Sequence, residues 1–282
     1  MLFLNRENEI NENMDNPQTP QRQPWYKRMG LGGAFAALVA LAKWKSVLSF
    51  IQGLLLIFKF SKFGATTLSM IATIVVYAWI YGIWWAVGFV LLIAVHEFGH
   101  IVAAKQQGIP VTAPVFIPFI GALIGIKESP KDVATESIIA YGGPLFGLLA
   151  AVGVHLAAYV LHSPLLFSLA FTGYFLTIFN LIPASPLDGG RIAGAVSPYS
   201  WFIGIPLIGV LIWFSFSPIL ILVLFAAVHR AWGFWKQRND EYYDIDTVFR
   251  LKIGVAYLVL MILSGVLTYE AHLTAEALRP RI

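Results

Sequence analysis

The sequence predicts an all-α polytopic membrane protein with six to seven transmembrane helices. Of the 282 residues, 58% are hydrophobic and 12% are charged, and the mean hydropathy is +0.74. Soluble domains carry about 25% charged and about 45–50% apolar residues, so the composition departs from theirs in both respects. The uncharged runs agree, because Glu97 is the only charged residue between Lys62 and Lys105. The composition therefore argues against a soluble enzyme, a disordered regulator and a small disulfide-bonded domain.

The apolar runs are long enough for several membrane crossings. A helix needs about 20 mostly apolar residues to cross roughly 30 Å of hydrocarbon. Two stretches near the start, 31–42 and 46–58, are shorter, and we expect them to lie at the membrane surface or to re-enter it. The stretch 201–214 is also short and contains Pro206, so the number of crossings is six or seven. We expect the crossings at about 64–83, 84–104, 136–161, 165–183, 200–214, 218–235 and 250–270.

Composition divides the chain into four parts. Residues 1–24 are polar and predict a disordered cytoplasmic tail. Residues 25–62 combine basic and apolar residues and predict an interfacial segment. Residues 64–200 form the core that carries the motifs described below, and residues 201–282 are expected to be C-terminal transmembrane helices.

The distribution of charge predicts the orientation. Positions 22–62 hold seven basic residues and no acidic one, and most of the remaining charge lies in 105–131, 188–191 and 236–252. The positive-inside rule places such segments, and with them the N-terminus, on the cytoplasmic side of the cell membrane. Basic residues beside apolar segments are typical of a flank attracted to anionic lipid. We therefore expect contact with the lipid bilayer and no nucleic-acid partner, although the net charge is +4.

One segment, 111–126, interrupts the helical pattern. It contains Pro114, Pro118, Gly121 and Gly125 among β-branched and aromatic residues. The prolines and glycines disfavour a continuous helix, and the apolar character disfavours a solvated loop. We expect a small membrane-associated β-hairpin or re-entrant element.

The strongest chemical signal is the run His96-Glu97-Phe98-Gly99-His100. On a helix, two histidines four residues apart share one face, so both imidazoles can bind one zinc ion. Glu97 is then placed to take a proton from zinc-bound water. A charge at this depth in the membrane costs ~3 kcal/mol on insertion scales, and such residues are functional by default. The alternative is a polar cluster that only holds helices together, for which Glu97 would be a costly choice.

A catalytic zinc needs a third protein ligand, and without cysteine it must come from His, Asp or Glu. Asp188 follows a long apolar run in which Pro183 and Pro186 end the helix, and Gly189-Gly190 permits close backbone approach. Taken alone, Asp188 would more often be a helix N-cap. Beside the two histidines, we interpret it as the third ligand.

Other polar residues near the charged loops are weaker candidates. Glu128, Asp132 and Glu136 lie in the loop after Lys105 or at its edge, and we expect them to be too shallow to reach the metal. Arg191 is expected to neutralise phosphate or carbonyl groups near the cytoplasmic face.

The motifs together resemble the site-2 protease family of intramembrane zinc metalloproteases. HEFGH lies in one crossing, NLIPASPLDGGR lies at the end of a later one, and YGGPL at 141–145 is similar to the family's motif of a small residue followed by Gly-Pro. The resemblance covers about 64–200 and implies a three-helix metalloprotease core with one preceding crossing. It implies one Zn²⁺ per chain, with His96, His100 and Asp188 as ligands and Glu97 as the catalytic base.

The resemblance also implies how a substrate is held. It places Asn180 near the substrate backbone and the 111–126 segment as a β-element that receives it. An unwound transmembrane substrate needs partners for its freed backbone groups, and strand addition would supply them. Phe119 and Gly121 are therefore candidate substrate-binding residues. The implied partner is a transmembrane protein or a signal-peptide remnant, and the sequence does not choose between them or fix the oligomeric state.

Three alternatives compete with a site-2 protease. A zinc-binding membrane transporter could use the same His and Asp residues, although the repeat symmetry expected of transporters is not seen in the sequence. An inactive protease homologue would keep the motifs without the activity. A protease of prenylated proteins has a related HExxH motif, but such enzymes take a glutamate as third ligand, and no glutamate follows at comparable depth.

Overall fold

The structure is a computed structural model that describes residues 49, 53, 62–236 and 240–277. Residues Ile57–Ile282 form one compact unit, and everything below concerns the described residues of this unit. The predicted polar tail, 1–24, lies outside the described residues. So does nearly all of the predicted interfacial segment, 25–62, including its two short apolar stretches.

The described residues are mostly helical, as predicted. Five helices are long and apolar enough to cross a membrane, whereas α7 and α9 are shorter, with 17 and 14 residues. Two of the seven predicted crossings are thus helices below the usual spanning length. The helices are α4 (Lys62–Tyr81), α5 (Ile83–Gln106), α6 (Val133–Leu161), α7 (Pro164–Asn180), α8 (Asp188–Val196), α9 (Trp201–Phe214), α10 (Pro218–Lys236) and α11 (Thr247–Ala277), with a 3₁₀ turn, η1 (Glu241–Tyr243), before α11.

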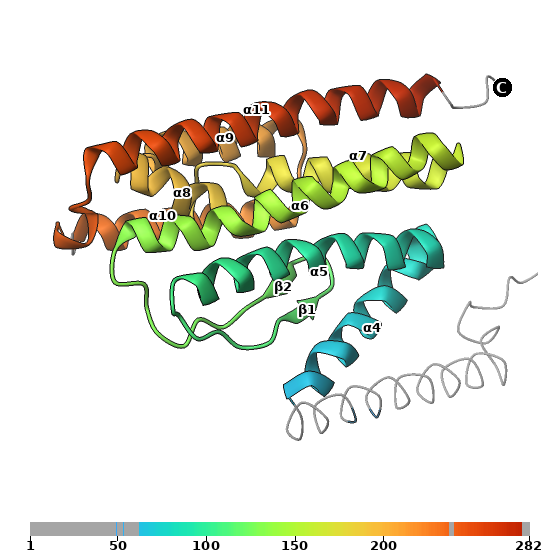
Figure 1. Ribbon diagram of the computed structural model, residues 1–282, viewed down its shortest axis with the longest axis horizontal. Helices are drawn as coiled ribbons and strands as arrows, with labels where there is room; N and C mark the ends of the chain where they lie inside the picture. The colour runs from blue at the N-terminus through green and yellow to red at the C-terminus, as the bar shows by residue number, and fades with distance from the viewer. Residues whose placement is uncertain (1–48, 50–52, 54–61, 237–239, 278–282) are drawn as a thin grey trace, which may run out of the picture. The chain divides into compact units, whose positions relative to one another are not determined.

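Helix α6 lies between α5 and α7, and α11 packs against α7 and the short α8 (Figure 1). The largest buried apolar cluster joins these elements, with Tyr174 of α7, Ile192 of α8 and Tyr257 of α11 among its members. Helix α8, which starts at Asp188, therefore packs against α6 and α11.

Helices α5 and α6 approach each other through two facing glycines. A Cβ on Gly99 would lie 2.2 Å from the carbonyl oxygen of Gly142, and a Cβ on Gly142 would lie 2.6 Å from that of Gly99. Real Cβ atoms do not come so close to an oxygen, so only glycine permits this spacing. The glycine at 142 is therefore required by the backbone contact that sets the distance between the two helices.

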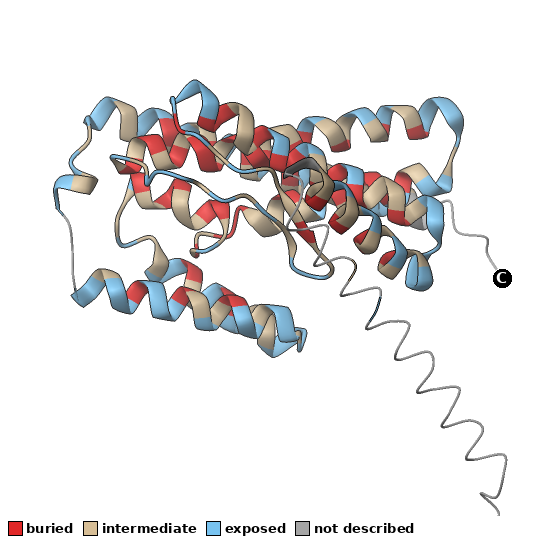
Figure 2. Ribbon diagram, turned by 90° about the horizontal axis from the view of Figure 1, so that it is seen from below, coloured by how far each residue is buried: buried red, intermediate tan, exposed pale blue. Residues whose placement is uncertain are grey.

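The outer surface of the unit is apolar. Buried residues line the inward faces of the helices, and exposed residues follow the outward faces (Figure 2). Many of the exposed side chains are large and hydrophobic, and Trp79 and Trp213 are 89% and 87% exposed. So much exposed apolar surface suits lipid rather than water, and exposed tryptophans are typical of membrane interfaces. The protein is a multi-pass membrane protein.

The interruption after α5 is a β-hairpin, which confirms the prediction for 111–126. Strands β1 (Val115–Ile117) and β2 (Gly121–Leu123) pair antiparallel, with Phe116 opposite Ala122, and an isolated bridge joins Val111 to Ile126. The turn between the strands places Phe119 and Gly121 at positive φ, 66° and 111°.

Side chains of α4 hold the first strand of the hairpin. The Thr66 hydroxyl donates to the Pro114 carbonyl at 2.7 Å, and the Ser69 hydroxyl accepts from the Phe116 N–H at 3.1 Å. The Tyr77 hydroxyl accepts from the Phe119 N–H at 2.9 Å. Because α4 contacts β1 and α5 contacts β2, the second strand is the one that lies beside the predicted metal ligands.

Candidate metal centre

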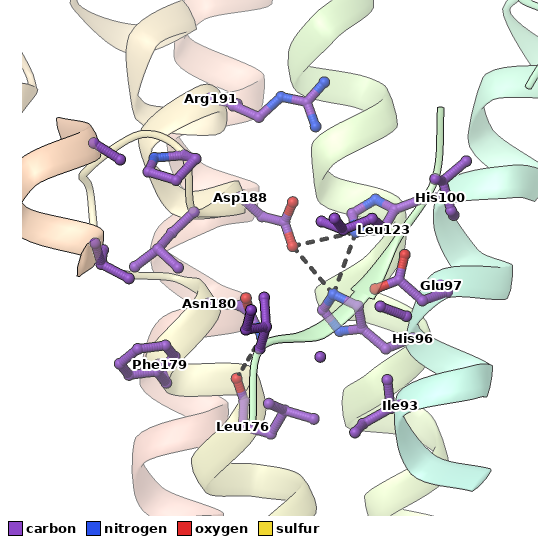
Figure 3. A pocket seen from close by; sticks show the side chains of 18 of the residues that line it. Ile93, His96, Glu97, His100, Leu123, Leu176, Phe179, Asn180, Asp188 and Arg191 are labelled. Carbon is purple, nitrogen blue, oxygen red and sulfur yellow. Dashed lines mark hydrogen bonds and ion pairs between the residues drawn. The ribbon is translucent and has the colours of Figure 1, made fainter. Parts of the chain in front are cut away.

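Three predicted ligands converge at one point inside the helix bundle. His96 and His100 lie one turn apart on α5, and Asp188 is the first residue of α8. The Oδ2 atom of Asp188 lies 3.1 Å from Nε2 of His96 and 3.2 Å from Nε2 of His100, and the two Nε2 atoms are 3.2 Å apart (Figure 3). The N-cap of α8 is Leu187, so Asp188 faces the histidines rather than capping the helix.

The spacing of these three atoms fits a tetrahedral zinc ion. Zinc bonds to nitrogen and oxygen are about 2.0–2.1 Å long, which places the ligand atoms roughly 3.3 Å apart at the corners of a tetrahedron. Two nitrogens and a carboxylate oxygen are a usual ligand set for zinc. Three such atoms also concentrate electron density at one buried point, which a cation between them would stabilise.

Hydrogen bonding prepares His100 as a ligand. Its Nδ1 lies 2.8 Å from the Ile139 carbonyl of α6, so Nδ1 carries the proton and Nε2 keeps the lone pair that a metal requires. The carbonyl lies beside a weakened turn of α6, because Pro144 inside the helix has no N–H to donate to the carbonyl of Ala140. The proline of the YGGPL motif, Pro144, is thus in the part of α6 whose Ile139 carbonyl orients the His100 side chain.

Glu97 lies next to the centre and is 8% exposed. It lines the same cavity as His96, His100 and Asp188 (Figure 3). Its carboxylate forms no hydrogen bond or ion pair with the described part of the chain. A buried carboxylate beside three metal ligands, with its oxygens uncommitted, is suited to moving a proton.

The cavity beside the centre has a volume of about 440 Å³. Gly121 and its neighbours in β2 line one wall, and Asn180 at the end of α7 lines another, whereas Phe119 lies in the hairpin turn outside the lining. The Asn180 Nδ2 donates to the Leu176 carbonyl at 2.9 Å, which leaves its Oδ1 and one N–H for another partner. Helix α10 supplies a further wall with Leu222 and its neighbours, which the sequence did not predict.

Two of the three rival carboxylates, Asp132 and Glu136, have other partners. Asp132 caps α6 by accepting from the Thr135 N–H at 2.7 Å. Burial opposes its ionisation, but the Thr135 hydrogen bond and the nearby Lys131 charge outweigh it and hold the pKa of Asp132 below its ordinary value. Glu136 pairs with Arg191 at 3.0 Å. The prediction that Arg191 neutralises phosphate or carbonyl groups missed this partner, because nothing local connects two residues so distant in sequence.

Close backbone approach around the centre confirms the expectation for the glycines after Asp188. A Cβ on Gly189 would lie 2.2 Å from the Leu181 carbonyl, and a Cβ on Gly190 would lie 2.0 Å from the Ser185 nitrogen. The loop between α7 and α8 therefore folds directly over the first turn of α8, which brings Asp188 back toward α5.

We expect Gly143→Ala to lower the zinc content sharply. A Cβ at position 143 would lie 2.2 Å from Nε2 of His100, the atom that would bind the metal. Elemental analysis of the purified variant measures the effect, and Gly153→Ala on the same helix is the control because nothing lies within 4 Å of its Cβ. Equal zinc in both variants would show that His100 does not need the space at Gly143.

The long apolar helices and the buried His/His/Asp centre with its adjacent glutamate define a membrane protein with a metalloprotease-type site. The sequence profile of peptidase family M50 matches residues 84–163, which include both histidines and the YGGPL motif. A zinc metalloprotease of Methanocaldococcus jannaschii is 27% identical over 186 residues, covering 60% of this chain and 53% of that protein. Over residues 84–163 the chain is therefore similar to peptidase family M50.

Further similarities cover smaller parts. Rip3 of Mycobacterium tuberculosis, provisionally described as a zinc metalloprotease, is 35% identical over 135 residues, which are 44% of this chain and 32% of Rip3. A solved site-2 protease from Methanocaldococcus jannaschii is 26% identical, with a TM-score of 0.42 and coverage of 57% of this chain and 85% of that one. The chain spans about half of the length of the Methanocaldococcus jannaschii zinc metalloprotease and about a third of the length of Rip3.

Proposed function

We propose that the protein is a zinc metalloendopeptidase that hydrolyses peptide bonds within or near transmembrane segments of membrane proteins. The observation that carries the proposal is the convergence of His96, His100 and Asp188 beside Glu97 in a buried cavity. A zinc ion held by these ligands would act as a Lewis acid that lowers the pKa of a water molecule and polarises a carbonyl. The proposal includes one zinc per chain.

The residues of the chain supply the rest of the chemistry. Glu97 accepts a proton from the attacking water as the oxygen bonds to the peptide carbonyl carbon, and it returns that proton to the nitrogen when the carbon–nitrogen bond breaks. Asn180 contributes a hydrogen bond to the substrate backbone from the opposite wall of the cavity. The apolar walls from β2 and α10 limit the entry of bulk water.

Removal of the metal tests the function. We expect the purified full chain to cleave a transmembrane substrate in detergent or liposomes, to lose this activity on treatment with a zinc chelator, and to regain it on addition of about one equivalent of zinc. Cleavage is measured by mass spectrometry of the products, which also locates the bond. Cleavage that persists after zinc has been removed completely would contradict a zinc peptidase.

The substrate is proposed to bind as a strand beside β2. This strand lines the cavity, and its partner β1 is held by α4, so an extended peptide can add to its outer edge. Proline at Phe119 or Gly121 is a poor test, because both residues have positive φ and proline would distort the turn itself.

A scan of the substrate avoids that problem. We expect N-methylation of single peptide bonds near the scissile bond to lower the cleavage rate at every second position, because alternate N–H groups of a strand point toward the same edge. Rates of cleavage of synthetic transmembrane peptides by the unaltered enzyme measure this. A response without two-residue periodicity would argue against strand addition.

The orientation and the partner follow from the charge distribution. We infer that the N-terminus and the opening of the site face the cytoplasm, since the charged loops flank the α5 and α8 ends next to the centre. The proposed substrate is a transmembrane protein or a signal-peptide remnant. Protease accessibility of tags placed in the loop after α5 and in the turn between α4 and α5 tests this orientation.

A further inference from the structure

The helix that carries Asp188 is short and lacks a side-chain cap. Helix α8 has nine residues, and its N-cap, Leu187, provides no side-chain hydrogen bond. A helix of this length is marginal on its own. The position of Asp188 relative to the two histidines must therefore be set by contacts between α8 and its neighbours.

One of these contacts is a sheltered ion pair one turn away from the ligand. Arg191 follows Asp188 by three residues on α8, and it lines the same cavity as the three ligands (Figure 3). Its Nε lies 3.0 Å from Oε1 of Glu136 on α6, and the two side chains are only 20% and 13% exposed. Such a pair holds its geometry better than an exposed one, because water and salt screen it less.

Glu136 is itself fixed by other elements. Its Oε2 accepts a hydrogen bond from the Tyr242 hydroxyl of η1 at 2.6 Å, and the Arg230 guanidinium of α10 lies 3.6 Å from its Oε1. Both carboxylate oxygens are therefore engaged. The carboxylate forms a fixed point to which Arg191 attaches the first turn of α8.

The other end of α8 is held by α11. The Arg250 guanidinium donates to the Ala195 carbonyl at 2.9 Å and also to the Tyr243 carbonyl. The last carbonyls of a helix lack partners within it, and a positive charge there is favourable. Both ends of α8 are thus bound by charged side chains that lie outside the metal centre.

We propose that Glu136 and Arg191 are positioning residues for the metal centre. Their ion pair sets where the Asp188 carboxylate lies, and so determines how tightly the three-ligand site binds zinc. The proposal rests on the zinc site of the proposed function and deepens it. Neither residue is one of the three metal ligands, and only Arg191 lines the cavity beside them. In this proposal both residues act on the metal through Asp188. An ion pair that only stabilises the fold would leave the metal affinity unchanged.

Zinc affinity of the full chain in detergent tests the proposal. We expect Glu136→Gln to bind zinc about 10–100-fold more weakly in competition with a chromophoric chelator, the loss typical of residues that orient metal ligands. The absorption spectrum of the Co²⁺-substituted variant should also change, because it reports ligand geometry. The control is Glu270→Gln, which alters another α6 contact, the 2.7 Å hydrogen bond from Tyr159, and should bind zinc like the wild type.

A double-mutant cycle tests whether Glu136 and Arg191 affect zinc binding through their ion pair. Arg191→Gln should weaken zinc binding as much as Glu136→Gln, and the double variant should be no weaker than either, because the two residues act together. Wild-type affinity and spectrum in both single variants would overturn the positioning role while leaving the proposed function intact. A wild-type protein that binds no zinc would overturn both.

A milder variant keeps the test decisive if Glu136→Gln does not fold. Glu136→Asp keeps the negative charge but withdraws the carboxylate from Arg191 by one methylene, which lengthens the ion pair. A several-fold loss of zinc affinity in this variant supports the proposal, and unchanged affinity overturns it.

Discussion

Glu97→Gln is expected to abolish peptide hydrolysis and to leave zinc bound. The amide has nearly the shape of the carboxylate, but it cannot accept the proton of the attacking water. General-base groups contribute about 10²–10⁴-fold to rates, so cleavage should fall by at least that range. His96, His100 and Asp188 remain in place because Glu97 forms no contact with them that the fold requires. Product formation and zinc content, measured on the same preparation, check both parts.

This variant also separates the proposed peptidase from a zinc-binding transporter. A transporter would use the histidines and Asp188 without needing a proton acceptor at Glu97. Glu97→Asp is a useful companion variant, since it keeps the carboxylate but withdraws it by one methylene, and it should retain partial activity. Full activity in Glu97→Gln would exclude Glu97 as the base.

Asp188→Ala is expected to remove most of the zinc. The variant leaves only the two imidazoles of α5, whereas catalytic zinc sites use three protein ligands. Zinc per chain, measured after purification without chelators, should fall from near one to a small fraction. The matched control is Asp132→Ala, which removes the cap of α6 at a cost of about 1 kcal/mol but lies outside the centre, so its zinc content should stay near that of the wild type.

Two results would contradict the assignment. Zinc retained in Asp188→Ala would mean that another group supplies the third ligand. Wild-type protein without zinc would point to a different metal or to a homologue that has lost the activity. Glu136 is one rejected carboxylate to consider, and its engagement with Arg191 and Tyr242 argues against it.

Local patterns in the sequence were sufficient to predict much of this molecule. The spacing of His96 and His100 specifies one helix face, and the uncharged runs specify apolar helices. Their bounds lie within about three residues of the observed ones, except that the last helix continues to Ala277 rather than ending near 270. The prolines and glycines of 111–126 predicted a hairpin or a re-entrant element because they disfavour a helix. These features depend on residues that are close together in the sequence, so they can be predicted from the sequence alone.

Contacts between distant segments could not be predicted in the same way. Arg191 gives no sign that its partner is Glu136, 55 residues earlier, and the apolar residues of α10 give no sign that they line the cavity. The need for glycine at 99 and 142 becomes clear only when the two helices are side by side. The sequence marks 201–214 as short for a crossing, but it does not show that the crossing predicted at 165–183 ends at Asn180 and has only 17 residues.

The separation of the ligands along the chain has a consequence for the order of assembly. Asp188 follows His96 by 92 residues, and α6 and α7 are made between them. While the protein is being synthesised, α5 can offer a metal only its two imidazoles. The third ligand arrives after α8 has folded back, and Arg250, which holds the far end of α8, emerges later still. A nascent chain therefore has no complete three-ligand centre until α8 has been synthesised and has packed against the earlier helices.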